Sequence, residues 1–251
     1  MLSLPPEILD LIVDHLHDEP TTLKACCLVS KSWVWRTRWH LFFHVEFNTA
    51  ESSFEKWMKV FQEPSNSPAH HTRTLSIFGP EVVAAASADR RAWIHPFRHI
   101  TTLSVDMKDT PGVSLVHLHG LSPTLISLGL FHPTIPPSEV INLICSFPLL
   151  EDLYLSSLRI EGDTDKWKVP PTSPKLTGSL YVSGGLGSVA RRLLDLPSGL
   201  RSTMLTVMGF VEDVEPAMGL VSGCSATLKS LRVGYIASAF RSVPKADQWL
   251  I

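Results

Sequence analysis

The chain has 251 residues, 44% of them hydrophobic and 18% charged, with a formal net charge of −2. This balance is typical of globular proteins and excludes a largely disordered chain, which would combine low hydrophobicity with high net charge. It provides no basic field that would attract nucleic acid or an anionic membrane, and no apolar run reaches the roughly 18 residues that span a bilayer. The arginine pairs at 90–91 and 191–192 lie in mixed segments and are interpreted as solvent-exposed.

The cysteines indicate a reducing compartment. Cys26 and Cys27 are adjacent in an apolar helical run, where cysteine behaves as a small hydrophobe, and Cys145 and Cys224 are isolated. No CxxC pair and no Cys/His spacing suited to zinc is found, and residues 1–5 do not resemble a secretory signal. We therefore expect the cytoplasm or the nucleus.

Three helices are expected in residues 1–46. The first begins at Pro5-Pro6-Glu7, where proline is tolerated and a carboxylate meets the positive end of the helix dipole, and it runs to about His17. A second is expected from about Thr21 to Trp35, and a third covers Trp39–Phe43. The apolar arc of the first helix is about 200° wide, about twice a single core-facing stripe. The excess apolar surface must face either the rest of the chain or another protein.

Two sequence blocks in this region resemble a known motif. The first reads Leu4-Pro5-x-Glu7-Ile8, and the second reads Leu28-Val29-Ser30-Lys31-x-Trp33. Hydrophobic residues at 9, 12, 16 and 23 fill the interval. Residues 2–46 thus resemble the F-box, and the chain is similar to fungal F-box proteins.

The resemblance implies a three-helix module that binds the SKP-family adaptor of a cullin–RING ubiquitin ligase. The residues that it assigns to the adaptor surface or its support are Leu4, Pro5, Ile8, Leu9, Ile12, Leu16, Cys27, Leu28, Val29, Ser30 and Trp33. Some of them must instead hold the module's own helices together. The sequence does not separate these two roles.

Residues 47–69 are expected to form a helix and a joint between domains. Phe54, Trp57, Met58 and Phe61 follow helical spacing, and the Pro/Ser/Asn-rich run at 64–68 ends the helix.

From residue 70 to residue 251 the chain repeats a leucine-rich strand pattern. The central leucines are 25 to 28 residues apart, at Leu75, Leu103, Leu128, Leu153, Leu180, Leu205 and Leu231. This period falls within the range of leucine-rich repeats, and helices are expected between strands at 138–147, 188–196 and 211–221. The prediction is an α/β protein in which the F-box precedes a curved leucine-rich-repeat-like solenoid with parallel strands. An ordinary α/β domain with leucine-rich strands is the alternative.

The apolar tail Trp249-Leu250-Ile251 follows the last strand closely. A solenoid end exposes apolar surface unless it is capped. The tail is interpreted either as a minimal cap or as a sign that the array is truncated.

Patterns with catalytic or metal-binding potential are incomplete. Residues 184–188 (Gly-Gly-Leu-Gly-Ser) miss the phosphate-loop and dinucleotide frames and indicate a strand-to-helix turn. His117-x-His119 would place two ligands on one strand face without a third, and the His70-His71 pair is expected in a loop. The acidic run at 161–165 lacks the calcium-loop register. We expect no catalytic residue, metal or cofactor; an enzyme embedded in the repeats is the third class of function, after a ligase subunit and an interaction scaffold.

The expected function is client recognition for a SKP–cullin–F-box ubiquitin ligase. The client would contact strand positions between the leucines: Ser104, Ser127, Asp152, Tyr154 and Arg232. Ubiquitin transfer would then depend on proximity to the partner-borne conjugating enzyme. The alternative is a non-catalytic interaction scaffold that directs no ubiquitination.

Overall fold

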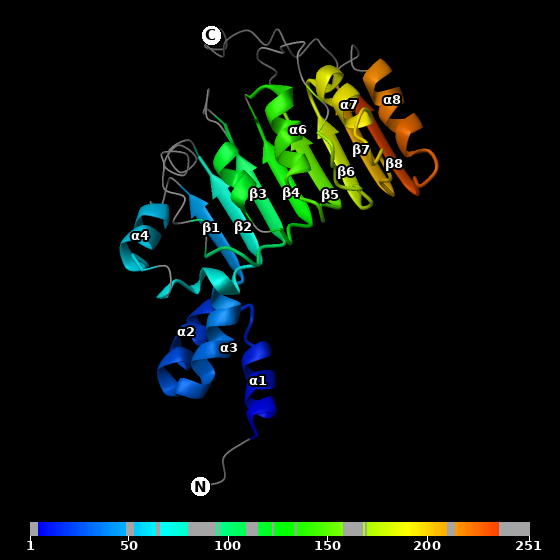
Figure 1. Cartoon of the computed structure of the whole chain (residues 1–251). Coiled ribbons are helices and arrows are strands. Elements are labelled where there is room, and N and C mark those ends of the chain that lie inside the picture. The colour runs from blue at the N-terminus through cyan, green and yellow to red at the C-terminus, as the bar shows by residue number, and fades with distance from the viewer. Residues whose placement is uncertain are drawn as a thin grey trace, which may run out of the picture.

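The computed structural model describes residues 5–48, 53–63, 66–79, 94, 96–108, 115–121, 123–133, 135–157, 168, 170–209 and 214–235. These residues form an α/β protein with seven α-helices and one eight-stranded sheet (Figure 1). All strands are parallel and follow one another across the sheet in chain order. The expected α/β class with parallel strands is confirmed.

Three helices lie together beyond the β1 end of the sheet: α1 (Pro6–Asp14), α2 (Pro20–Val29) and α3 (Lys31–Leu41) (Figure 1). Proline occupies the first turn of α1 and of α2, where its missing N–H has no intrahelical partner to lose.

The prediction of one helix from Thr21 to Trp35 is wrong, because the chain breaks at Ser30. Ser30 adopts an extended conformation, and its Oγ accepts a hydrogen bond from the Ser32 N–H at 3.3 Å. This arrangement is a helix N-cap, so the hydroxyl ends α2 and starts α3.

The strands of the sheet are short and regular. Their bounds are β1 (His44–Asn48), β2 (Thr74–Phe78), β3 (Thr102–Asp106), β4 (Ser127–Phe131), β5 (Asp152–Ser156), β6 (Ser179–Ser183), β7 (Met204–Gly209) and β8 (Ser230–Tyr235). Each of the seven leucine-centred segments is a strand. β1 is an additional strand, which starts within the predicted helical module and continues into the predicted joint.

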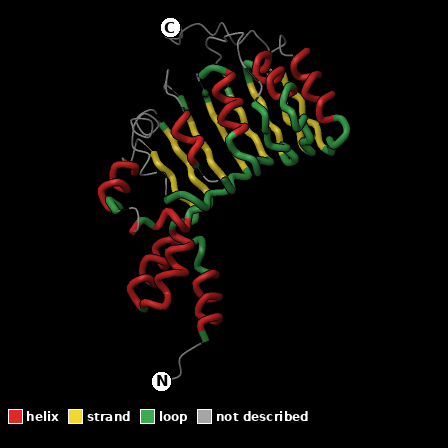
Figure 2. The backbone as a smooth tube through the Cα atoms, in the orientation of Figure 1, coloured by secondary structure: helices red, strands yellow, loops and turns green. Residues whose placement is uncertain are grey.

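Helices cover one face of the sheet. α6 (Pro137–Cys145), α7 (Leu186–Leu194) and α8 (Val214–Cys224) lie side by side along it (Figure 1), close to their predicted positions, and α4 (Ser53–Val60) packs against β1. Short 3-10 helices η3 (Pro68–His71) and η5 (Val116–Gly120) complete the described helical segments (Figure 2).

The core lies between the sheet and these helices. Register pairs the central leucines strand by strand, so that Leu103, Leu128 and Leu153 form one continuous buried row. Because side chains alternate across a strand, the same register sends the residues between them to the opposite face. At the β1 end, aromatic rings of Phe47, Phe54 and Trp57 pack together with centroids 5.2 to 5.6 Å apart.

Gly184 and Gly185 form the predicted turn between β6 and α7. Their φ angles are 70° and 52°, in the left-handed region that favours glycine.

Two further predictions are wrong. His117 and His119 belong to η5 and not to a strand, because the chain crosses between β3 and β4 as a 3-10 helix. Arg192 is only 8% exposed and Arg191 is exposed, since only one side of α7 faces solvent. The Arg90–Arg91 pair, the acidic run at 161–165 and the tail at 236–251 lie outside the described residues.

Candidate docking surfaces

An apolar surface remains exposed on α1 and α2. Leu28 is 89% exposed and Val29 is 69% exposed at the end of α2, and on α1 the exposed apolar side chains are Ile8, Leu11 and Ile12. Exposed apolar side chains of this kind indicate that each of these two helices is a candidate docking surface.

The residues assigned by the F-box resemblance are all incompletely buried where the structure describes them. Pro5, Ile8, Ile12, Leu28 and Val29 are exposed. The partly buried members are Leu9, Leu16, Cys27, Ser30 and Trp33, and Leu4 lies outside the described residues. The interior of the three helices consists instead of Val13, Leu23, Cys26 and Thr37. The apolar arc of the first helix does not distinguish the buried Val13 from Ile8 and Ile12, which are exposed on the same helix.

Polar contacts hold the three helices together. Thr37 Oγ1, which is buried on α3, donates to the Trp33 carbonyl at 2.7 Å and lies 2.9 Å from Cys27 Sγ on α2. The partial burial of Cys27 therefore reflects an internal role.

Two further cysteines, Cys145 on α6 and Cys224 on α8, are poor nucleophiles. Burial raises the pKa of the Cys145 thiol to about 11 and also raises the pKa of the Cys224 thiol, which disfavours thiolate formation at both.

Asp14 ties α1 to α3 through a bidentate ion pair. Arg36 Nε and Nη2 donate to the two carboxylate oxygens at 2.5 and 2.6 Å, and His40 Nε2 lies 2.8 Å from Oδ1. The hydrogen bond from Arg36 holds the pKa of Asp14 at about 2, against an ordinary value of 3.8. Because this pKa is depressed, the stabilisation is present at neutral pH and is lost as the pH falls from about 4 towards 2.

Replacing Asp14 by Asn is expected to lower the free energy of unfolding by about 1 kcal/mol at pH 7, allowing for the partial solvent exposure of the pair. The difference from the wild type should shrink as the pH is lowered through about 4 to 2. Urea unfolding followed by circular dichroism at pH 7 and pH 3 measures both effects. Asp10→Asn, an exposed carboxylate on the same helix, is the control, and an equal loss in that variant would contradict the assignment.

The helical unit joins the sheet without a flexible spacer. The Phe43 carbonyl accepts hydrogen bonds from the Arg73 and Thr74 N–H groups at 2.9 and 3.0 Å. The Trp35 ring packs edge-on against His71, with ring centroids 4.5 Å apart. His71 is buried in η3 and not in a loop, and this burial lowers its pKa to about 4, so the imidazole is neutral at pH 7.

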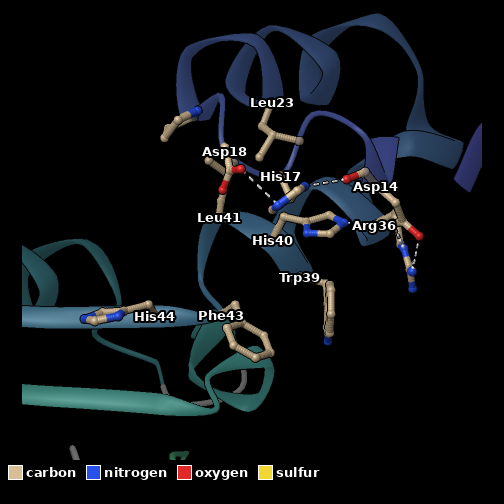
Figure 3. Close-up of a pocket in the computed structure, with 11 residues that line it drawn as sticks. Asp14, His17, Asp18, Leu23, Arg36, Trp39, His40, Leu41, Phe43 and His44 are labelled. Atoms are coloured by element: carbon tan, nitrogen blue, oxygen red, sulfur yellow. Dashed lines mark hydrogen bonds and ion pairs between the residues drawn. The ribbon is translucent and has the colours of Figure 1, made fainter. Parts of the chain in front are cut away.

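A cavity of about 700 Å³ lies at this junction, between the helices and the start of β1 (Figure 3). In Figure 3, His17, His40 and Asp14 point toward one another, beside the apolar side chain of Leu23. His17 is three positions from Asp14 in sequence, whereas His40 is 26 positions from it, so no local motif predicts that all three meet. Among the described residues, no group of three or more His, Cys, Asp or Glu is placed to hold a metal ion.

The face of the sheet opposite the core is the second candidate surface; we call it the open face. Its strand positions alternate with the buried leucines, and no described helix covers it. All five predicted client-facing residues lie on it: Ser104, Ser127, Asp152, Tyr154 and Arg232. Ser104 is paired with Gly129 of β4, which is paired in turn with Tyr154 of β5, so these residues lie near one another. Arg232 lies on β8, three strands beyond β5.

Two aromatic residues close to Tyr154 on the open face were not predicted. Tyr181 stacks on Tyr154, with ring centroids 6.4 Å apart and planes at 30°. Phe131 lies one strand away, and a β-carbon added at Gly129 would meet its ring at 3.0 Å. Both residues occupy positions of β4 and β6 that alternate with the buried row. The two-residue period of a strand could therefore have predicted that they lie on the open face.

Comparison with known proteins yields no assignment: neither a protein-family model nor a curated protein matches this chain. No helix among the described ranges is long and apolar enough to cross a membrane.

Proposed function

We propose that this chain is the substrate-recognition subunit of a SKP–cullin–F-box ubiquitin ligase. In this proposal α1, α2 and α3 are the F-box that binds the SKP-family adaptor. The sheet and its helices are a leucine-rich-repeat-like solenoid that binds a client protein. The protein would work in the cytoplasm or the nucleus and perform no covalent chemistry itself.

The observation that carries the proposal is the exposure of Leu28 and Val29 within the second motif block. A leucine that is 89% exposed gains nothing from this chain's own core, so the apolar residue contributes only if a partner covers it. Neighbouring Ser30 fixes the direction in which α3 leaves α2. The pair is thereby presented at the corner between two helices.

The short connection between the helices and the sheet supports the second half of the proposal. Backbone hydrogen bonds from Arg73 and Thr74 to Phe43 connect the end of α3 directly to the start of β2. A client held on the sheet would thus keep a limited range of positions relative to an adaptor bound at α2. Ubiquitin transfer by proximity benefits from such restricted geometry.

Binding of the purified full chain to a purified SKP-family adaptor tests the proposal. We expect a 1:1 complex in size-exclusion chromatography and a Kd below about 1 μM by calorimetry. Failure of the wild-type chain to bind would contradict the F-box assignment. In a reconstituted ligase, adaptor binding without ubiquitination of a captured client would instead indicate a scaffold.

A further inference from the structure

We propose that the open face of β4, β5 and β6 binds an arginine-bearing segment of the client, with Tyr154 and Tyr181 as its platform. This inference rests on the proposed function only in identifying the segment as part of a client. The binding chemistry itself follows from the side chains on the sheet.

The two tyrosines form an ordered aromatic surface. They occupy paired positions on adjacent strands, their rings are stacked, and Tyr154 is 36% exposed. The ring of Phe131 extends this surface across Gly129, which lacks the β-carbon that would displace it. Such rings lose little entropy on binding and present a negative π-face to a cation.

Within strands β2 to β6, the charged side chains on the open face have one sign. The open-face side chains of β2 through β6 are mainly Ser, Thr and aromatic residues, and the charged ones in these strands are Asp106 and Asp152. Asp106 Oδ1 lies 3.0 Å from His132 Nδ1, at the end of the strands. The first open-face arginine is Arg232, on β8. Charge complementarity therefore favours a cationic partner.

Asp152 is held in a fixed position beside Tyr154. Its Oδ1 accepts a hydrogen bond from the Ser179 N–H at 2.6 Å, and a β-carbon at Gly178 would collide with the carboxylate. Residues two apart on a strand lie about 7 Å apart on the same face. A guanidinium stacked on the Tyr154 ring can therefore reach the Asp152 carboxylate, a combination that suits arginine better than the compact ammonium of lysine.

Fluorescence anisotropy of the full chain with labelled 12-residue Gly/Ser peptides tests this proposal. One peptide carries three arginines, a second carries citrulline and a third glutamate at the same positions. We expect the arginine peptide to bind at least 10-fold more tightly than the other two and to weaken with added salt. Equal binding of the arginine and citrulline peptides, or no arginine-peptide binding up to 1 mM, would overturn the proposal.

Variants locate the site. Tyr154→Ala should weaken arginine-peptide binding about 10-fold, Tyr154→Phe should retain it, and Asp152→Asn should weaken it about 5-fold. Glu46→Gln, an exposed carboxylate on the open face of β1, should leave binding unchanged. Unchanged binding in both Asp152→Asn and a folded Tyr154→Ala variant would refute the site. Adaptor binding is measured separately, so an adaptor that fails to bind while the peptide binds refutes the proposed function alone.

Discussion

Replacing Leu28 by Gln and Val29 by Thr together is expected to weaken binding of the SKP-family adaptor by about 100-fold. Both side chains are largely exposed in the free chain, at 89% and 69%. Their apolar area leaves water only in the complex, so the loss falls on binding and not on folding. The variant loses the burial of the leucine side chain and of one valine methyl group in the complex. Together these losses reduce the binding free energy by about 3 kcal/mol, which corresponds to about a 100-fold increase in Kd.

The control for this double variant is Val60→Thr. Val60 is 68% exposed on α4, which matches Val29, but it lies outside the three helices assigned to the F-box. Calorimetric titration should give wild-type affinity for the control, and thermal unfolding should give similar midpoints for all three proteins. Equal adaptor affinity of the double variant and the wild type would remove the central support for the F-box assignment.

The structure separates side chains that the motif alone treats alike. Leu23 and Leu28 lie on the same helix, yet Leu23 is 1% exposed and Leu28 is 89% exposed. Which leucine is covered depends on which side of α2 packs against α3. Periodicity predicts that a helix has an apolar excess, but which part of the excess is internal depends on packing between helices.

The repeat pattern predicts the sheet far better than it predicts the helical unit. A strand has a two-residue period, so locating the leucine row also assigns the intervening residues to the opposite face. This is why Ser104, Asp152 and Tyr154 are found on the open face as expected.

Features that depend on distant residues could not be predicted in this way. Asp14 and Arg36 are 22 positions apart and form a bidentate pair only because α1 packs on α3. The strand β1 alternates over five residues only, too few to distinguish it from the end of a helical module without its partner β2.

Leu153→Ala is expected to lower the free energy of unfolding by about 2–5 kcal/mol, through lost burial and the cavity left behind. Leu153 is fully buried on β5, between paired leucines of β4 and β6. In a chain of this size each kcal/mol lowers Tm by about 2–4 °C, so a decrease of about 10 °C should be seen by differential scanning calorimetry.

Leu231→Ala is the matched control, because it makes the same change in the same row of the sheet. Leu231 lies on β8, at the end of the described sheet, and is 48% exposed. Because about half of the Leu231 side chain stays in contact with water in the folded chain, its burial contributes only about half of the full transfer free energy to stability. The expected loss of unfolding free energy is therefore about 1 kcal/mol or less. If Leu231→Ala cost as much as Leu153→Ala, Leu231 would have to be buried in solution as deeply as Leu153. Equal costs would thus contradict the end of the sheet as the structure describes it.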